Sequence, residues 1–74
     1  MAKWFWNAKS NPFSTTDPDD WKEYSSEDNR TIEDAWSKKQ EKASLERYYV
    51  YFGNLMQVSR DDFHKQRPVK RVPL

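Results

Sequence analysis

The chain has 74 residues, no Cys and a formal net charge of +1. We expect residues 1–74 to form a single small domain, and because such domains bury only about 60% of their unfolded surface, the core must depend on large aromatic side chains. The absence of Cys excludes a disulfide framework and favours an intracellular protein, and no run approaches the roughly 18 apolar residues of a membrane span.

The N-terminal part of the chain predicts two strands separated by a long loop. Lys3 to Asn7 contains three consecutive aromatic residues, which suit a strand because aromatic side chains fit a half-buried pleated surface. Residues 9–20 are rich in Pro, Asn, Asp and Ser, which favour turns, and Phe13 is the one large apolar anchor. Trp21 to Tyr24 is expected to be a second, short strand. A loop of this length in so small a domain is either functional or an insertion.

A single amphipathic helix is expected over about residues 27–42. Ser25 and Ser26 precede it, and a Ser hydroxyl can accept a hydrogen bond from an unpaired N–H group of the first helical turn. Acidic residues follow directly, near the positive end of the helix dipole. The apolar side chains that recur at helical spacing are Ile32, Ala35 and Trp36.

Residues 47–60 predict a β-hairpin, because two aromatic and β-branched runs meet at Gly53 and Asn54, a pair suited to a two-residue turn. This turn places Val50 opposite Gln57. Side chains alternate between the faces of a strand, so one face carries Tyr48, Val50, Phe52, Leu55 and Gln57. The other face carries Tyr49, Tyr51, Met56 and Val58. The first face is apolar at the turn and polar at the open end, which is typical of a core that opens into a binding pocket.

The last predicted strand covers Arg67 to Val72. Pro68 cannot donate to a ladder of hydrogen bonds, so this strand should begin at Pro68 or lie at an edge of the sheet. Alternation puts Arg67 on the same face as Val69, which draws it toward the polar end of the hairpin. The order of elements predicts an α+β fold with one helix packed on a curved sheet. The expected core is Trp4, Trp21, Ile32, Trp36, Phe52 and Leu55.

Several separated motifs of the chain are similar to those of one protein family. They are Trp4-Phe-Trp6, Trp21-x-x-Tyr24, Ile32 to Trp36, Tyr48 to Gln57 and Arg67-Pro-Val-Lys-Arg71. Together they resemble the WWE domain over about residues 3–72. The resemblance implies an antiparallel half-barrel of about five to six strands wrapped around one helix. It also implies a non-catalytic accessory module of larger proteins linked to ubiquitin ligation or ADP-ribosylation, whose best-characterised members recognise poly(ADP-ribose) through its iso-ADP-ribose unit.

The resemblance also implies a ligand site. The pocket Tyr, the pocket Gln and the phosphate-binding Arg of the family fall on Tyr48, Gln57 and Arg67. The aromatic residue two positions after the first Trp falls on Trp6, which offers a face for stacking on adenine, and a basic residue shortly after it corresponds to Lys9. The long loop adds acidic residues that would repel a pyrophosphate if they faced this pocket. They are Asp17, Asp19 and Asp20.

The residue types themselves suit an anionic ligand. The planar guanidinium of Arg offers paired hydrogen bonds to phosphate oxygens. Residues 45–74 carry six Lys or Arg against three Asp or Glu, so this part of the chain is the better place for an anion. A strong basic patch is missing, which argues against a general nucleic-acid binder.

Besides ligand binding, the sequence allows a protein-interaction role, whereas it argues against catalysis. The chain could be a protein-interaction module without nucleotide binding, for example in a ubiquitin ligase or an intracellular phospholipase, that uses Tyr49, Tyr51 and Met56. Catalysis, a cofactor and a metal are not expected, because no nucleophile motif is present and His64 is the single His. We expect a monomer without a membrane span, whose partners are poly(ADP-ribose) or ADP-ribosylated proteins.

Overall fold

The computed structural model describes residues 2–74, in which one helix packs against an antiparallel sheet. In chain order the elements are β1 (Ala2–Asn7), β2 (Trp21–Glu23), α1 (Ser26–Ser37), β3 (Lys42–Ser44), β4 (Tyr48–Tyr51), β5 (Met56–Ser59) and β6 (Gln66–Pro73). The six strands lie in the order β2-β1-β6-β5-β4-β3, which confirms the α+β fold. Over these residues, no helix has the length and apolar character needed to cross a membrane.

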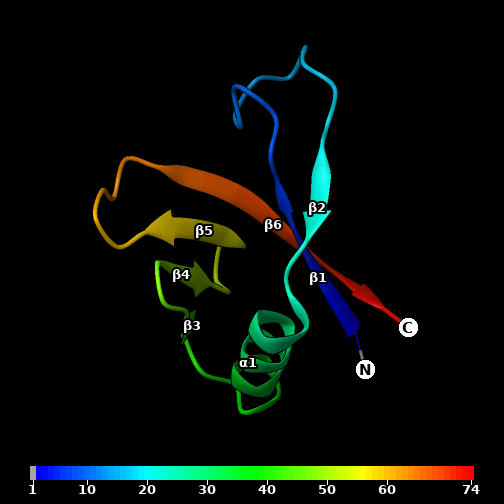
Figure 1. The fold of residues 1–74 in the computed structure, drawn as a ribbon, viewed down its shortest axis with the longest axis vertical. Helices are drawn as coiled ribbons and strands as arrows, with labels where there is room; N and C mark the ends of the chain where they lie inside the picture. The colour runs from blue at the N-terminus through cyan, green and yellow to red at the C-terminus, as the bar shows by residue number, and fades with distance from the viewer. Residues whose placement is uncertain (1) are drawn as a thin grey trace.

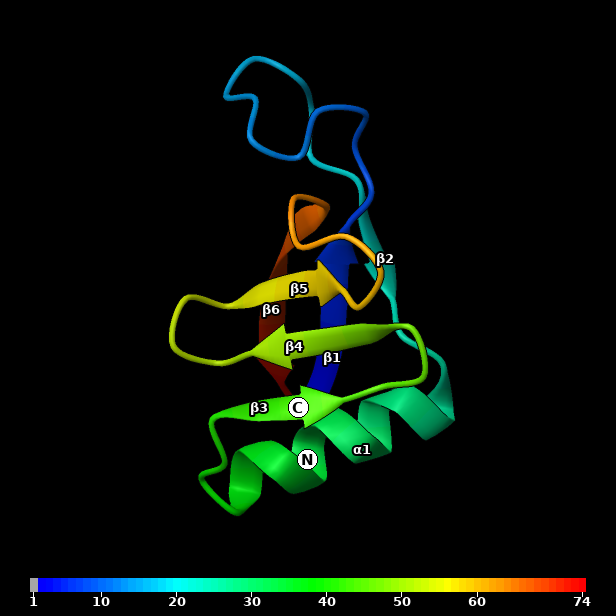
Figure 2. The same ribbon diagram turned by 90° about the vertical axis from the view of Figure 1, so that its left-hand side faces the viewer.

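The strand β6 joins the two parts of the sheet. Its residues 66–68 pair with β5, whereas residues 69–73 pair with β1. The strands β1 and β2 therefore run at an angle to β3, β4 and β5, and the sheet curves (Figure 1). The helix covers one end of the concave face, where it lies against β3 and β1 (Figure 2).

Pro68 lies inside a central strand, so the prediction that its strand begins there or lies at an edge is wrong. The Val69 N–H donates to the Leu55 carbonyl, on the β5 side, at 2.9 Å. Successive N–H groups of a strand point to opposite sides, so an N–H at position 68 would point toward β1. Because β1 pairs with no residue of β6 before Val69, the proline costs the sheet no hydrogen bond.

The helix begins as predicted but ends earlier. Ser25 Oγ accepts the Asp28 N–H at 3.2 Å, as expected of an N-cap. At the other end Lys39 has φ 58°, and its N–H and that of Gln40 donate to carbonyls of the last helical turn. These two bonds form a Schellman motif, which commonly has Gly at the left-handed position. Since no Gly marks this end in the sequence, the predicted helix continued wrongly to residue 42, where β3 begins.

The hairpin of β4 and β5 has the predicted register, with Val50 opposite Gln57. Its turn differs from the prediction, because it comprises the four residues 52–55. The left-handed residue is Leu55, at φ 52°, and Gly53 does not adopt a positive φ. A left-handed residue interrupts the alternation of side chains between faces. Leu55 is accordingly 37% exposed, and its assignment to the core is wrong.

The core forms around Trp4, which is fully buried together with Ile32 and Val50. The ring centroids of Trp36 and Phe52 lie 5.4 Å and 5.6 Å from that of Trp4. These contacts agree with the predicted core, although Trp36 at the helix surface remains 38% exposed. Large aromatic side chains therefore supply much of the apolar area that stabilises this small domain.

Trp21 does not join this core, contrary to the prediction. It pairs with Asn7 of β1, and alternation along β1 puts Asn7 on the face opposite Trp4. Trp21 therefore lies on the convex face, where the Lys70 Nζ is 4.5 Å from its ring centroid. The register of β2 on β1, which follows a long connection, could not be read from the spacing of the aromatic residues.

Glu33 connects the helix to two strands. Its Oε1 accepts the indole N–H of Trp4 at 2.9 Å and the Nε–H of Arg71 at 3.0 Å, and its Oε2 accepts from Arg71 Nη2 at 2.8 Å. The hydrogen bonds from Arg71 lower the pKa of Glu33 to about 2, although partial burial acts in the opposite direction. This cluster fixes α1 on β1 and β6.

The two ends of the described chain lie side by side, because Ala2 of β1 pairs with Pro73 of β6. The connection of residues 8–20, between β1 and β2, lies at the opposite end of the molecule (Figure 1). The paired strands β1 and β6 thus extend from the chain ends toward this connection.

We expect Glu33→Gln to lower the free energy of unfolding by about 1 to 2 kcal/mol, because the amide keeps the size of the side chain but loses its charge-assisted hydrogen bonds. The folded pKa of Glu33 lies below its usual value of 4.5, so the contribution of the carboxylate is complete above about pH 4.5 and is lost as the pH falls toward 2. Urea unfolding of both proteins at pH 7 and at pH 2 should show a difference that shrinks on acidification. A difference independent of pH would contradict this role.

Candidate functional site

A cleft of about 740 Å³ opens at the end of the concave face away from the helix, and no residue of α1 lines it. Its walls come from β1, β4, β5 and β6, from the connection of residues 8–20, and from the turn between β5 and β6. Four of the five predicted site residues line this cleft, namely Trp6, Tyr48, Gln57 and Arg67. Their contact with a ligand remains a prediction.

Antiparallel pairing explains why these side chains meet. Gln57 of β5 lies between Val50 of β4 and Arg67 of β6 in one row across the sheet. Residues paired in this way share a face, so Arg67 lies on the same concave face as the buried Val50. In the next row Tyr48 lies opposite Ser59. The concave face therefore changes from core to cleft along the hairpin, as its sequence predicts.

Gln57 is held by a tyrosine that the site prediction did not include. Its side chain is only 5% exposed, and its Oε1 accepts the hydroxyl of Tyr24 at 2.6 Å. Burial raises the pKa of Tyr24 far above its usual range, so the phenol stays protonated and donates. Among residues 2–74 no fully buried side-chain N or O lacks a partner. The Gln57 Nε2 makes no hydrogen bond in this range, so it is not fully buried.

Arg67 links the cleft to the connection of residues 8–20. Its Nη1 donates to the carbonyls of Asn7 at 3.1 Å and of Lys9 at 2.8 Å. The guanidinium carbon lies 5.9 Å from the ring centroid of Trp6, within the range of a cation–π contact. Its Nε and Nη2 make no hydrogen bond within the part of the chain that the structure describes, so two donor groups are left for a ligand.

Lys9, the fifth predicted residue, does not line this cleft. Its Nζ donates to the Ser14 carbonyl and to Asp19 Oδ1 at 3.2 Å, and its side chain is 9% exposed. Asn7 also donates to Asp19, and these hydrogen bonds from Asn7 and Lys9 lower the pKa of the carboxyl. The ammonium of Lys9 is therefore used within the connection of residues 8–20.

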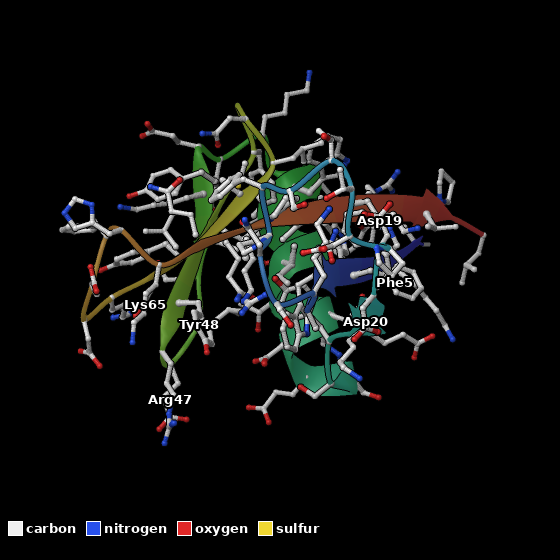
Figure 3. All side chains as sticks on the ribbon, turned by 90° about the horizontal axis from the view of Figure 1, so that it is seen from above. Phe5, Asp19, Asp20, Arg47, Tyr48 and Lys65 are labelled. Atoms are coloured by element: carbon white, nitrogen blue, oxygen red, sulfur yellow. The ribbon has the colours of Figure 1, made fainter. Side chains whose placement is uncertain are left out.

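The acidic residues of this connection also lie outside the cleft. Asp17 and Asp20 line a separate depression together with Lys9, and this depression shares no lining residue with the cleft. Figure 3 shows Asp19 and Asp20 on the opposite side of the view from Tyr48. The acidic residues of this connection therefore do not face the cleft as lining residues.

Two cations that line the cleft were missed by the sequence analysis. Arg47 lies directly before β4, and Lys65 lies in the turn before β6 (Figure 3). Both residues lie outside the strands, where side chains do not alternate between faces. The alternation in the hairpin therefore could not predict that Arg47 and Lys65 line the cleft. Asp61 and His64 line the same end. With Arg67, the three cations exceed the one carboxylate, in agreement with the positive balance of residues 45–74.

The cleft can hold a flat, hydroxylated and anionic molecule by non-covalent contacts. Trp6 and Tyr48 offer aromatic surface, Gln57 and the Tyr48 hydroxyl offer hydrogen bonds, and the cations suit phosphate oxygens. For the residues described, no group of three or more His, Cys, Asp or Glu side chains is arranged to hold a metal ion.

Comparison with known proteins gives one family. A family model described as the WWE domain matches residues 2–71. This range includes the helix and every residue that lines the cleft. No curated protein sequence matches the chain.

We expect Tyr24→Phe to lower the free energy of unfolding by about 1 kcal/mol, because it removes the donor to a buried amide oxygen of Gln57. The matched control is Tyr48→Phe, since the Tyr48 hydroxyl makes no hydrogen bond over residues 2–74, and it should leave stability nearly unchanged. Urea denaturation measures both effects. Equal effects of the two substitutions would show that the bond to Gln57 contributes nothing specific.

Proposed function

This chain belongs to the WWE domain family, a family of non-catalytic binding modules, and on that premise we propose that its cleft recognises ADP-ribose units. The ligand class is the iso-ADP-ribose unit that joins two ADP-riboses in poly(ADP-ribose). Free poly(ADP-ribose) and ADP-ribosylated proteins both carry this chemistry. The parent of such a module is a larger protein linked to ubiquitin ligation or to ADP-ribosylation.

One observation carries this proposal. Tyr48, Gln57 and Arg67, which are far apart in the sequence or on different strands, line one cleft on the concave face together with Trp6. Each retains a group that can reach a ligand, because no hydrogen bond within residues 2–74 uses the Tyr48 hydroxyl, the Gln57 amide nitrogen or two of the Arg67 nitrogens. An iso-ADP-ribose needs these three kinds of contact for its riboses and phosphates.

The preorganisation of Gln57 supports a specific contact. Because the Tyr24 hydroxyl donates to the amide oxygen at 2.6 Å, the Gln57 side chain, which lines the cleft, has little freedom to rotate. Rigidly held donors bind a ligand more tightly than mobile ones, since less conformational entropy is lost on binding. A ribose hydroxyl is the natural acceptor for such a donor.

The charges of the cleft support an anionic ligand. Arg67 provides a planar fork for one phosphate, and Arg47 with Lys65 provides a second cationic region at the turn between β5 and β6. The two phosphates of iso-ADP-ribose match these three cations better than a single phosphate does.

The first experiment is a titration of isotope-labelled protein with iso-ADP-ribose, followed by NMR. The amides of Tyr48, Gln57 and Arg67 should shift together, whereas those of α1 should not. The absence of shifts at millimolar ligand would contradict the proposed function.

We expect Arg67→Ala to weaken iso-ADP-ribose binding by about 1.5 to 3 kcal/mol, the usual range for a hydrogen bond to a charged group. Calorimetry measures the loss. Lys42→Ala removes one cation from the convex face and is the charge-matched control, with no loss expected. Arg67→Lys retains the charge without the fork and should recover only part of the affinity. A loss for Arg67→Ala no larger than for Lys42→Ala would remove Arg67 from the site.

A protein-interaction role is the second candidate, and one feature of the convex face favours it. We define the tyrosine patch as Tyr49, Tyr51 and Met56, whose two phenol rings lie 6.2 Å apart. Lys42 Nζ and the Arg60 guanidinium carbon lie 4.3 Å and 4.4 Å from the Tyr49 ring centroid. Neither cation forms an ion pair within residues 2–74. Such a surface would suit an acidic segment of a protein partner.

The two candidates are separated by comparing two substitutions on opposite faces of the sheet. For a partner bound by the tyrosine patch, we expect Tyr51→Ala to reduce capture at least about fivefold, because aromatic anchors dominate interface energies, while Arg67→Ala leaves it unchanged. Capture of a defined partner on immobilised protein measures the effect. The reverse pattern, with Arg67→Ala alone abolishing capture, would assign that partner to the cleft.

A further inference from the structure

The connection of residues 8–20 is held in a defined shape, although it has no regular secondary structure. Lys9 Nζ donates to the carbonyl of Ser14 and to the carboxylate of Asp19, so it ties two points of the connection together. Asn7 Nδ2 also donates to Asp19, at 3.1 Å, which attaches this brace to the end of β1. A loop with these internal bonds can hold a side chain in a fixed place.

The large apolar side chain of this connection is Phe13. Its N–H donates to Asn11 Oδ1 at 3.2 Å, and the Ser14 N–H donates to the Asn11 carbonyl at 3.1 Å, so a tight turn encloses it. Phe13 lines the cleft beside Pro12 and yet is 58% exposed. The connection therefore does not bury its one large apolar side chain in the core but leaves it open at the mouth of the cleft.

The ring of Trp6, which also lines the cleft, is less exposed to solvent than that of Phe13. Trp6 packs against the core and is partly buried, and the Arg67 guanidinium lies 5.9 Å from its ring centroid. A base stacked on Trp6 would have to share that ring with Arg67. Phe13 has no such neighbour among the cation–π contacts of residues 2–74, so its ring offers the more accessible surface.

We propose that Phe13 is a base-stacking residue of this cleft, and that the connection of residues 8–20 provides the surface on which the adenine of an ADP-ribose unit lies. Stacking on an aromatic side chain suits a purine, because both partners present flat π faces. Trp6 then supports Arg67 as it binds phosphate. This inference rests on the proposed function of the cleft and names the residue that carries its preference for a purine.

On this proposal, Lys9 is a residue that positions Phe13. Its ammonium lies away from the cleft and holds Ser14, the residue next to Phe13. Its effect on a ligand would therefore pass through the aromatic ring and not through a direct contact with phosphate. This differs from the role that the family resemblance implies for Lys9, and the two roles give different results in a double substitution.

The test compares ligands with and without a base. Phe13→Ala should weaken binding of iso-ADP-ribose and of AMP at least about fivefold, in line with the usual loss per stacked base, and leave ribose 5-phosphate unchanged. Phe63→Ala is the matched control, because Phe63 is 63% exposed and does not line the cleft. If wild-type protein fails to bind iso-ADP-ribose, the proposed function is wrong. If it binds and Phe13→Ala binds equally well, the stacking role alone is overturned.

The role of Lys9 is tested with Lys9→Met, which keeps the length of the side chain without its charge. It should weaken iso-ADP-ribose binding in the wild-type background and cause no further loss in the Phe13→Ala background, because the two residues act as one unit. Lys9→Arg should restore binding. Equal losses in both backgrounds would instead assign Lys9 a direct contact with the ligand, and the absence of any loss would also overturn the positioning role.

Discussion

The carboxylate of Glu33 is the point at which helix, first strand and last strand are joined. It allows Trp4 to be fully buried, since the indole N–H finds an acceptor there, and it accepts hydrogen bonds from Nε and Nη2 of Arg71. Because this cluster fixes α1 at one end of the concave face, the other end stays uncovered. The cleft forms at that uncovered end, so the core and the candidate site are two parts of one surface of the sheet.

The transition between these two parts runs along single rows of paired residues. Val50 is fully buried, its neighbour Gln57 is buried with a hydrogen bond to Tyr24, and Arg67 follows at the cleft. A buried amide is costly unless its polar atoms find partners, and the protonated phenol of Tyr24 supplies one. The same bond that makes Gln57 compatible with the core also fixes a side chain that lines the cleft. Stability and binding geometry are thus served by one contact.

The sequence predicted the parts of the fold that depend on local periodicity. Alternation in the hairpin placed Gln57 on the concave face, and the N-cap at Ser25 marked the start of the helix. It failed where a left-handed residue is not Gly, at Lys39 and Leu55, because neither residue type marks such a conformation in a sequence. For the site, alternation along the strands predicted which residues share a face. The positions of Lys9, Arg47 and Phe13 depend on irregular segments, and side-chain hydrogen bonds such as Lys9 to Ser14 and Arg67 to Lys9 shape the connection of residues 8–20.

The pairing of Ala2 with Pro73 has a mechanical consequence. These residues are antiparallel neighbours at one end of a strand pair, about 5 Å apart as adjacent strands always are, so a force that separates the two chain ends would act on their hydrogen bonds one at a time. The hydrogen bonds between β1 and β6 would break one after another, from Ala2 toward Trp6. This requires less force than sliding the two strands along each other, which would break all of the bonds at once. Trp6 and Val69 are the last pair of this ladder, so tension on the domain would reach the cleft only after most of the ladder had separated.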